Sequence, residues 1–152
     1  MIETGGYYNA WIALFDQNDE LWITAKSGLG EKFQAIVSRL EKKELPFCGQ
    51  AVQKYSEVLV VQDYLSACQD CPLAGNYSGR AGMSVRLEYK GKTYGFLTVS
   101  IPSLIATYTE DQDLLQGVAD ELAFALYDIE LEEERRQAEK ALIEAKDKAE
   151  CA

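Results

Sequence analysis

The sequence predicts an α+β fold, in which an antiparallel sheet of about five or six strands has helices on one face and is followed by a long C-terminal helix. Two pairs of short apolar segments predict β-hairpins, because a polar or glycine-containing turn joins the members of each pair. Residues 109–152 contain no proline and consist mostly of good helix formers, so they predict one helix of roughly 60 Å. The 152 residues, 47% of them hydrophobic, are enough for a single core.

Local patterns indicate the individual elements. Residues 31–43 carry apolar side chains at helical spacing, whereas residues 81–90 alternate as a half-buried strand does. Thr109 begins a helix-capping pattern, and Trp11 and Trp22 of the first hairpin are both expected to pack in the core. The expected bounds are strands 10–16 and 20–27, helices 31–43 and 48–54, a strand at 58–61, an irregular segment at 64–79, strands 81–90 and 94–101, and a helix from 109 onward.

The composition excludes several classes of partner and cofactor. A formal net charge of −10 leaves no basic surface to neutralise phosphates, so nucleic acid is not expected as a partner. No apolar run is long enough to span a membrane, and the first residues lack a secretory pattern. Four cysteines are too few for a dense disulfide framework, so we expect a cytoplasmic protein without membrane insertion. Histidine is absent, which removes the commonest general base and haem ligand.

The two halves of the long helix differ in composition. The first half has an apolar side that is expected to face the core, whereas residues 131–152 are almost wholly charged or alanine. In this second half, the few apolar and small residues follow the 4/3 spacing of a parallel coiled coil, so we expect a homodimer through this helix. The alternative is an ordinary solvated helix. The apolar positions are Leu114, Leu115, Val118, Leu122, Ala125, Leu126 and Ile129 in the first half, and the coiled-coil positions are Leu131, Arg135, Ala138, Leu142, Ala145 and Ala149 in the second.

Three cysteines form the sharpest local feature. Cys68 and Cys71 are a C-x-x-C pair in the irregular segment, and Cys48 lies about twenty residues earlier. Two thiolates at this spacing can hold one metal ion or form a disulfide. Zinc or an iron–sulfur cluster needs further ligands, from neighbouring side chains or from a second copy. The alternative is that Cys48 is a small buried hydrophobe and that the pair in the loop is structural.

The order of elements and several motifs resemble a GAF domain, the small-molecule sensing module of bacterial signalling proteins. The resemblance covers about residues 8–130. The motifs are Ala10-Trp11-Ile12-Ala13-Leu14 in the first hairpin, Pro46-Phe47-Cys48 before the second helix, Tyr94-Gly95-Phe96-Leu97-Thr98-Val99 in the last strand, and Tyr108-Thr109-Glu110-Asp111-Gln112-Asp113-Leu114-Leu115 with Ala119-Asp120-Glu121-Leu122-Ala123-Phe124-Ala125-Leu126 in the final helix.

The resemblance implies that residues 1–130 are a sensory domain and that residues 131–152 are a helical linker to a histidine-kinase output domain of a two-component system. In GAF domains, the region that corresponds to residues 64–86 lines the ligand cavity together with the last two strands. Its ring faces, hydroxyls and positive charges suit an anionic or aromatic small molecule. The candidate ligand-binding residues are Tyr64, Tyr77, Arg80, Ser84 and Arg86.

The resemblance leaves three functions open. We expect a non-catalytic sensory domain that binds a small molecule, or senses redox or metal state through Cys48, Cys68 and Cys71, and signals through its last helix. One alternative is a dimerisation module with an unused pocket. The other is a cysteine-based methionine sulfoxide reductase, since GAF-like folds include such an enzyme. Bilin and histidine-ligated haem are excluded because both need a histidine.

Overall fold

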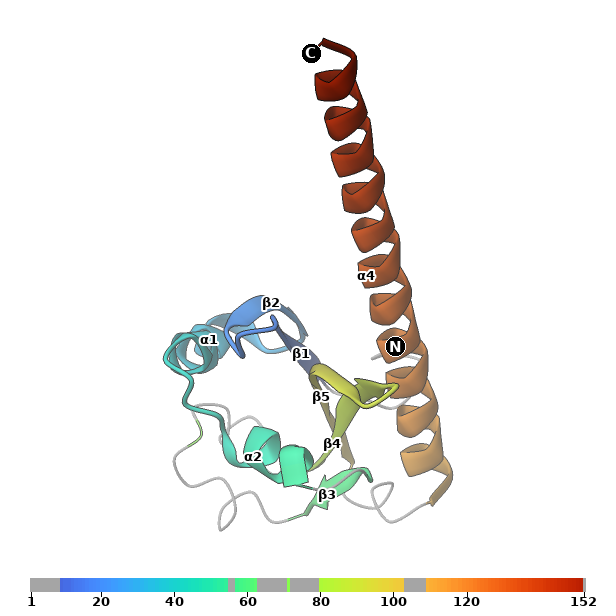
Figure 1. Cartoon of the computed structure of the whole chain (residues 1–152). Coiled ribbons are helices and arrows are strands. Elements are labelled where there is room, and N and C mark those ends of the chain that lie inside the picture. The colour runs from blue at the N-terminus through green and yellow to red at the C-terminus, as the bar shows by residue number, and fades with distance from the viewer. Residues whose placement is uncertain (1–8, 55–56, 63–70, 72–79, 103–108, 152) are drawn as a thin grey trace.

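The computed structural model describes residues 9–54, 57–62, 71, 80–102 and 109–151. Within these residues, five strands form one sheet in the order β2-β1-β5-β4-β3, and each strand is antiparallel to its neighbours (Figure 1). The predicted α+β fold with its long C-terminal helix is confirmed. The elements are β1 (Asn9–Phe15), β2 (Leu21–Ser27), the short 3-10 helix η1 (Gly30–Lys32), α1 (Phe33–Glu41), α2 (Phe47–Lys54), β3 (Leu59–Val61), β4 (Arg80–Tyr89), β5 (Lys92–Pro102) and α4 (Thr109–Cys151).

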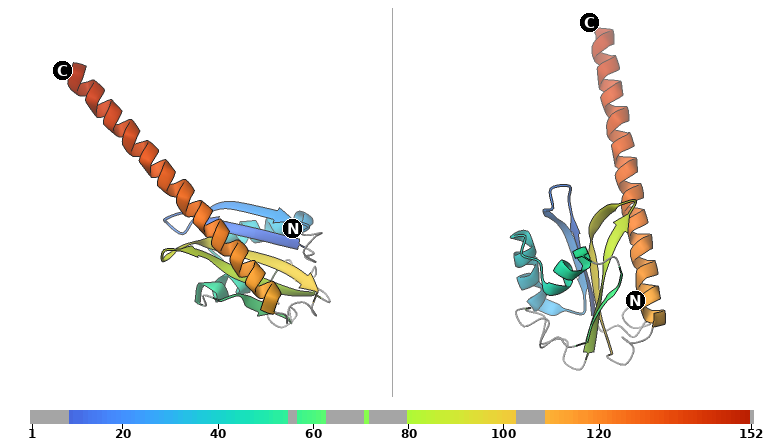
Figure 2. Two further views of the ribbon diagram at one scale, coloured as in Figure 1. Left: turned by 90° about the vertical axis from the view of Figure 1, so that its right-hand side faces the viewer. Right: turned by 60° about the horizontal axis from the view of Figure 1, so that its bottom comes forward.

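The sheet is covered on both faces. α1 and α2 lie against one face, and the first half of α4 lies against the other (Figure 2, right). α4 crosses the sheet obliquely and then projects beyond it (Figure 2, left). The sequence predicted helices on one face of the sheet, but it did not indicate that α4 covers the opposite face. None of the helices in the described ranges is long and apolar enough to cross a membrane.

Two tight turns close the predicted hairpins. In the β1–β2 turn, Oδ1 of Asp16 accepts hydrogen bonds from the backbone N–H groups of Asn18 (2.8 Å) and Glu20 (3.0 Å). In the β4–β5 turn, Lys90 and Gly91 have φ angles of 50° and 78°. Two consecutive positive φ angles suit a two-residue turn whose twist matches that of the flanking strands. Both hairpins are therefore set by local turn chemistry, as the sequence predicts.

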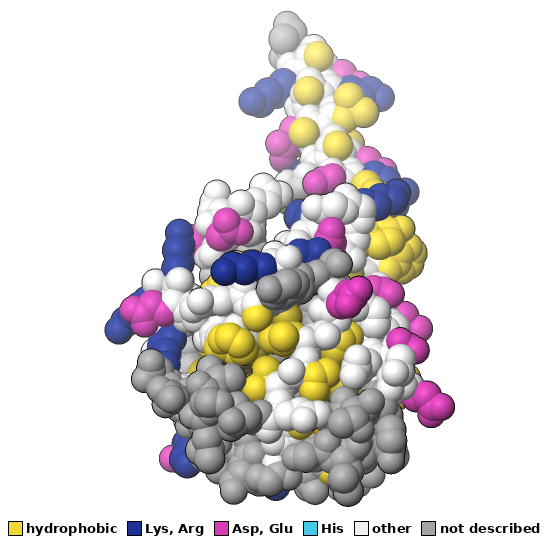
Figure 3. Space-filling view, turned by 90° about the horizontal axis from the view of Figure 1, so that it is seen from below, with side chains coloured by type: hydrophobic (Ala, Val, Ile, Leu, Met, Phe, Trp, Pro, Cys, Tyr) yellow, Lys and Arg dark blue, Asp and Glu magenta, His cyan; other side chains and the backbone are white. Residues whose placement is uncertain are grey.

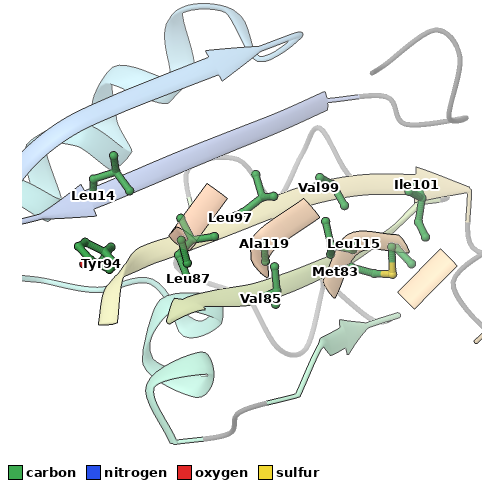
Figure 4. Packing of buried hydrophobic residues seen from close by; sticks show 12 residues of the cluster. Leu14, Met83, Val85, Leu87, Tyr94, Leu97, Val99, Ile101, Leu115 and Ala119 are labelled. Carbon is green, nitrogen blue, oxygen red and sulfur yellow. The ribbon is translucent and has the colours of Figure 1, made fainter. Parts of the chain in front are cut away.

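The core beneath α4 consists of alternate residues of β4 and β5. Met83 and Val85 of β4 lie below Leu115 and Ala119 of the helix (Figure 4). Residues two apart along a strand share one face, so the strand pairing gathers these side chains into one layer. The buried members of this layer are Leu14, Ala81, Met83, Val85, Leu87, Tyr94, Leu97, Val99, Ile101, Leu115, Ala119 and Ala123.

The buried side of α4 coincides only in part with the apolar stripe that the sequence indicated, because Leu115, Val118 and Leu126 of that stripe pack against the sheet and other members do not. Leu115, Ala119 and Ala123 face the sheet, whereas Leu114 and Ile129 are 56% and 61% exposed. Small alanine side chains let the helix backbone approach the sheet, and the bulkier residues lie beside the contact. The expectation that Leu114 and Ile129 face the core was therefore wrong.

The core beneath α1 and α2 is aromatic. The ring of Trp11 makes edge contacts with those of Phe33 (centroids 5.6 Å apart) and Phe96 (5.1 Å). Trp11 is 2% exposed, as expected, but Trp22 is 57% exposed, so the prediction for Trp22 was wrong. Trp22 lies on β2, an edge strand whose residues are mostly exposed.

α4 leaves the body of the protein at Glu130. The carboxylate of Glu130 accepts a hydrogen bond from Nζ of Lys92 at 2.6 Å. Just before this point, Tyr89 of β4 packs against Phe124 (ring centroids 5.3 Å apart) and Tyr127 (4.9 Å). Every residue from 131 to 150 is exposed. The helix therefore packs against the protein as far as the β4–β5 hairpin and projects into solvent beyond it.

Candidate functional site

The sheet face beneath α1 and α2 carries several buried polar side chains. Thr98 and Ser100 of β5 lie on this face, while the residues between and beside them face α4. The strand pairing places Thr98 between Trp11 and Ser84, and Ser100 beside Asn9. The hydroxyls of Ser84 and Thr98 are hydrogen-bonded at 2.8 Å. A polar patch therefore adjoins the aromatic core.

Several polar atoms of this face have no hydrogen-bond partner. Among the described residues, five buried side-chain nitrogen or oxygen atoms lack one. Four of them lie on this face, namely Asn9 Oδ1, Trp11 Nε1, Ser100 Oγ and Arg86 Nε, and the fifth is Tyr94 Oη. Leaving such an atom unpaired costs about 1–3 kcal/mol, so native proteins rarely do it. Buried polar atoms of this kind commonly hydrogen-bond to an ordered water or a polar ligand.

A pocket of about 350 Å³ opens at the end of this face nearest the hairpin turns. Its volume lies at the lower end of the range typical of small-molecule sites. The β1–β2 turn, the connection between α1 and α2, α2 itself and the hairpin ends of β4 and β5 form its walls. The lining residues are Phe15, Asp19, Lys43, Leu45, Val52, Gln53, Arg86, Thr93, Gly95 and Phe96.

Arg86 brings a shielded positive charge to the pocket. Its side chain is 18% exposed, forms an ion pair with Glu88 and donates a hydrogen bond from Nη1 to the carbonyl oxygen of Gln53 at 3.3 Å. Lys43 adds a second positive charge to the lining, and Asp19 adds a negative one. Both residues have φ near +60°, which is uncommon for a residue with a side chain. The wall therefore includes two backbone positions held in a sparsely populated conformation.

Two glycines allow close packing of the pocket walls. A Cβ atom on Gly49 of α2 would lie 2.8 Å from the ring of Phe96. A Cβ atom on Gly95 would lie 1.9 Å from the carbonyl oxygen of Ala13 on the neighbouring strand. Next to Gly95, Tyr94 is an extra residue that makes a β-bulge against β4. Bulges are frequent beside functional sites because they redirect side chains.

Two cysteine side chains lie on the same side of the sheet. Cys48 and Cys71 both pack against the core beneath α1 and α2. Burial raises the pKa of Cys48 to about 11, hydrogen bonds from the hydroxyls of Thr98 and Ser84 lower it, and the nearby Cys71 raises it. A thiol with this pKa stays protonated at neutral pH, so Cys48 by itself is a poor nucleophile.

The structure brings the described candidate ligand-binding residues to one face. Arg80, Ser84 and Arg86 are separated by even numbers of residues along β4, so their side chains share a face. Arg86 lines the pocket, and Ser84 hydrogen-bonds the thiol of Cys48. Arg80 begins the strand at the end away from the pocket.

Three predicted site residues, Tyr64, Tyr77 and Cys68, lie outside the described residues. Within the described ranges, no three cysteine or acidic side chains are grouped so that they could hold a metal ion. Zinc or an iron–sulfur cluster at Cys48, Cys68 and Cys71 therefore stays a prediction.

Sequence reasoning missed Lys43 and the polar residues of β5. Lys43 reaches the pocket from a connection between helices, where no periodic pattern points to a site. Thr98 and Ser100, in contrast, alternate with the apolar residues Leu97 and Val99. This alternation is readable, and it shows that one face of an otherwise buried strand is polar.

Two solved structures share the fold of this chain. One is a domain of a protein assigned as a two-component sensor histidine kinase from Sinorhizobium meliloti 1021, which is 21% identical with a TM-score of 0.66 over 90% of each chain. The other is the GAF domain of a phosphoenolpyruvate-protein phosphotransferase from Coxiella burnetii, which is 14% identical with a TM-score of 0.63 over 86% of this chain and 78% of that chain. This chain has a GAF fold.

GAF folds serve different activities. The type II free methionine-R-sulfoxide reductase from Thermoplasma acidophilum is also similar, with 16% identity and a TM-score of 0.51 over 83% of each chain. No protein-family model and no curated protein matches this sequence. At such identities the likeness extends to the fold alone, and function has to be argued from the site.

Proposed function

We propose that this chain is a sensory domain that binds a small molecule on the α1/α2 side of its sheet and passes the signal to α4. The observation that carries the proposal is the concentration of buried, unpartnered polar atoms on that face, beside a pocket. The similar domain of the two-component sensor histidine kinase supports a sensory role.

The lining of the pocket favours an anionic ligand with an apolar part. Arg86 and Lys43 supply two positive charges against the single negative charge of Asp19. The Nε–H group of Arg86 meets no acceptor among the described residues, so a carboxylate or phosphate oxygen can accept its hydrogen bond. Phe15 and Phe96, whose rings stack with centroids 6.2 Å apart, form an apolar wall. A small organic carboxylate or phosphate fits this combination.

The β4–β5 hairpin connects the pocket to the exit of the helix. Arg86 and Glu88 pair on the pocket side of β4, whereas Tyr89 packs against α4. Lys92, on the next strand, holds Glu130. A ligand that draws Arg86 away from Glu88 changes the end of β4 on which the helix contacts depend. In this proposal the hairpin carries the signal between the two faces of the sheet.

The projecting half of α4 is proposed as the output element and as the seam of a homodimer. Leu131 and Leu142 are 50% and 71% exposed, and hydrophobic side chains lie among charges of both signs along this half (Figure 3). A second copy covers these side chains if two such helices run in parallel. In the intact protein, which we propose to be cytoplasmic, the pair would continue into a kinase-type output domain of a two-component system.

The ligand test uses calorimetry or thermal shift with a set of small carboxylates and phosphates. Arg86→Gln should weaken binding of any hit by about 10- to 100-fold, because a charge-assisted hydrogen bond contributes about 1.5–3 kcal/mol. Arg136→Gln is the matched control, since Arg136 lies on the projecting half of α4 and pairs with Glu133 there. Equal affinity of the Arg86 variant and the wild type contradicts the proposed site.

The output test uses the intact protein with its kinase. Inserting one residue beside Glu134 turns everything that follows by about 100° relative to the sensory domain. We expect this insertion to uncouple the ligand from kinase activity, while an insertion of seven residues, two full turns, preserves coupling. Unchanged regulation after the single insertion argues against α4 as the transmitter.

Two alternatives predict different results. A dimerisation module with an unused pocket forms the dimer but binds nothing in the ligand set. A cysteine-based methionine sulfoxide reductase reduces free methionine sulfoxide with a thiol reductant, and the likeness to the Thermoplasma acidophilum enzyme keeps this assay relevant.

A further inference from the structure

The packed half of α4 has an exposed apolar side as well as a buried one. Leu115, Ala119 and Ala123 contact the sheet, whereas Leu114 and Phe124 are 56% and 52% exposed. A contiguous apolar surface with a polar rim is a common mark of a protein–protein interface. The exposed side of this half is therefore a candidate interaction surface.

This exposed side is in register with the coiled-coil positions of the projecting half. Phe124 precedes Leu131 by seven residues, and Leu114 precedes Leu142 by four heptads. Because α4 is one helix from Thr109 to Cys151, residues a whole number of heptads apart lie along the same coiled-coil seam. The seam positions of the packed half are Leu114, Gly117, Glu121, Phe124 and Asp128.

The projecting half alone offers little apolar surface to a second copy. Its seam positions hold two leucines, three alanines and one arginine. Coiled coils are typically marked by apolar seam positions that are sustained over at least three or four heptads. Phe124 and Leu114 raise the number of large apolar seam residues in each copy from two to four. A stable dimer would therefore draw on the packed half of the helix as well.

We propose that the dimer interface continues along the packed half of α4, so that a second copy of this chain covers Phe124 and Leu114. This inference rests on the homodimer proposed above and deepens it, because it brings the sensory domain itself into the interface. It does not depend on ligand binding in the Arg86 pocket.

The β4–β5 hairpin lies beside this surface and supplies a complementary charge. The ring of Tyr89 contacts that of Phe124, and Nζ of Lys90 lies 5.1 Å from the centroid of the Tyr127 ring. Tyr127 is at a flanking position, which in a parallel coiled coil faces the flanking residue five positions later in the other helix. That residue is Glu132 of the partner subunit. Lys90 would therefore pair with the partner's Glu132, and the pocket and the interface would adjoin the same hairpin.

Analytical ultracentrifugation over a range of concentrations tests the proposal. Phe124→Glu should weaken the dimer by at least about 100-fold, because it removes two aromatic rings from the interface and brings two like charges together. Ile129→Glu is the matched control, since Ile129 is 61% exposed on the same helix but lies about 140° around it from Phe124. The dissociation constant of this control should equal that of the wild type.

Charge reversal tests the hairpin contact by a second route. Lys90→Glu and Glu132→Lys should each weaken the dimer by about 3- to 10-fold, and the double variant should restore it. Glu133→Lys is the control, because Glu132 and Glu133 each pair with an arginine three residues later, and only Glu132 flanks the seam. These exposed side chains lie outside both cores, so this series decides the question if circular dichroism shows that Phe124→Glu fails to fold.

Leu142→Glu separates this proposal from that of the dimer itself. If Leu142→Glu yields monomers while Phe124→Glu leaves the dissociation constant unchanged, the interface is confined to the projecting half and its extension is wrong. A double charge variant that is no tighter than the single variants, or equal weakening by Ile129→Glu, also overturns the extension. A monomeric wild type overturns the extension together with the proposed homodimer.

Discussion

Gly95 offers the sharpest test of how the pocket wall is built, because one contact determines how much its replacement by alanine should destabilise the protein. The added Cβ would lie 1.9 Å from the carbonyl oxygen of Ala13, and a backbone atom in a paired strand cannot rotate away. Either β1 and β5 separate locally or the register next to the bulge at Tyr94 changes. Overpacking a core costs about 1–3 kcal/mol, and a clash with backbone lies at the upper end, so we expect Gly95→Ala to cost about 3 kcal/mol.

Gly117 provides the matched control, since the same substitution there should change the stability in the opposite direction. It lies within α4, and a Cβ atom would meet no heavy atom within 4 Å. Alanine is favoured over glycine in a helix by about 0.5–1 kcal/mol, so Gly117→Ala should stabilise the protein.

Thermal unfolding by circular dichroism distinguishes the two variants. For a chain of this size, 1 kcal/mol shifts Tm by roughly 2–4 °C. Gly95→Ala should therefore lower Tm by roughly 6–12 °C, while Gly117→Ala raises it by a few degrees. A Tm for Gly95→Ala within 2 °C of the wild type would refute the close approach of the two strands.

Two further predictions follow from the thiol of Cys48 and from α4. The thiol of Cys48 has an ordinary pKa of 9.0 when unfolded and a pKa of about 11 when folded, so between these pH values only the unfolded chain has lost the proton. Stability should therefore fall from pH 9 to 11, by up to about 3 kcal/mol, and urea titrations of Cys48→Ala should show a smaller fall. Leu142→Glu should convert the proposed dimer to a monomer, because it places like charges opposite each other where the two helices would meet. Analytical ultracentrifugation at moderate protein concentration measures this change. A dimer of unchanged stability would show that α4 is not the dimer interface.

Much of the fold was predictable because its elements obey local rules. The hairpins follow from turn chemistry, such as the Lys90–Gly91 turn, and from alternation along β4 and β5. The contact face of α4 was not predictable from hydrophobicity. Ala119 and Ala123 carry a weak apolar signal, and they face the sheet because they are small. Similarly, Trp22 is exposed because β2 is an edge strand, which depends on the order of strands in space.

The site was predictable where it lies on a strand. Arg86 was named because the resemblance to GAF domains implies that residues 64–86 line a ligand cavity, whereas Lys43 and Asp19 reach the same pocket from connections that have no periodicity. Long-range packing decides which connections reach the pocket, and local patterns do not encode it.

The ion pair between Lys92 and Glu130 makes the projecting helix a lever with its pivot at the edge of the domain. Some 21 residues lie beyond the pivot, which at 1.5 Å per residue gives an arm of roughly 30 Å. A tilt of about 5° at the pivot moves the far end by roughly 3 Å over an arm of this length. Helix shifts of about 1–2 Å are sufficient in known switching transitions. A rearrangement at the hairpin that is too small to alter the fold would therefore displace the end of the helix by as much as such transitions require.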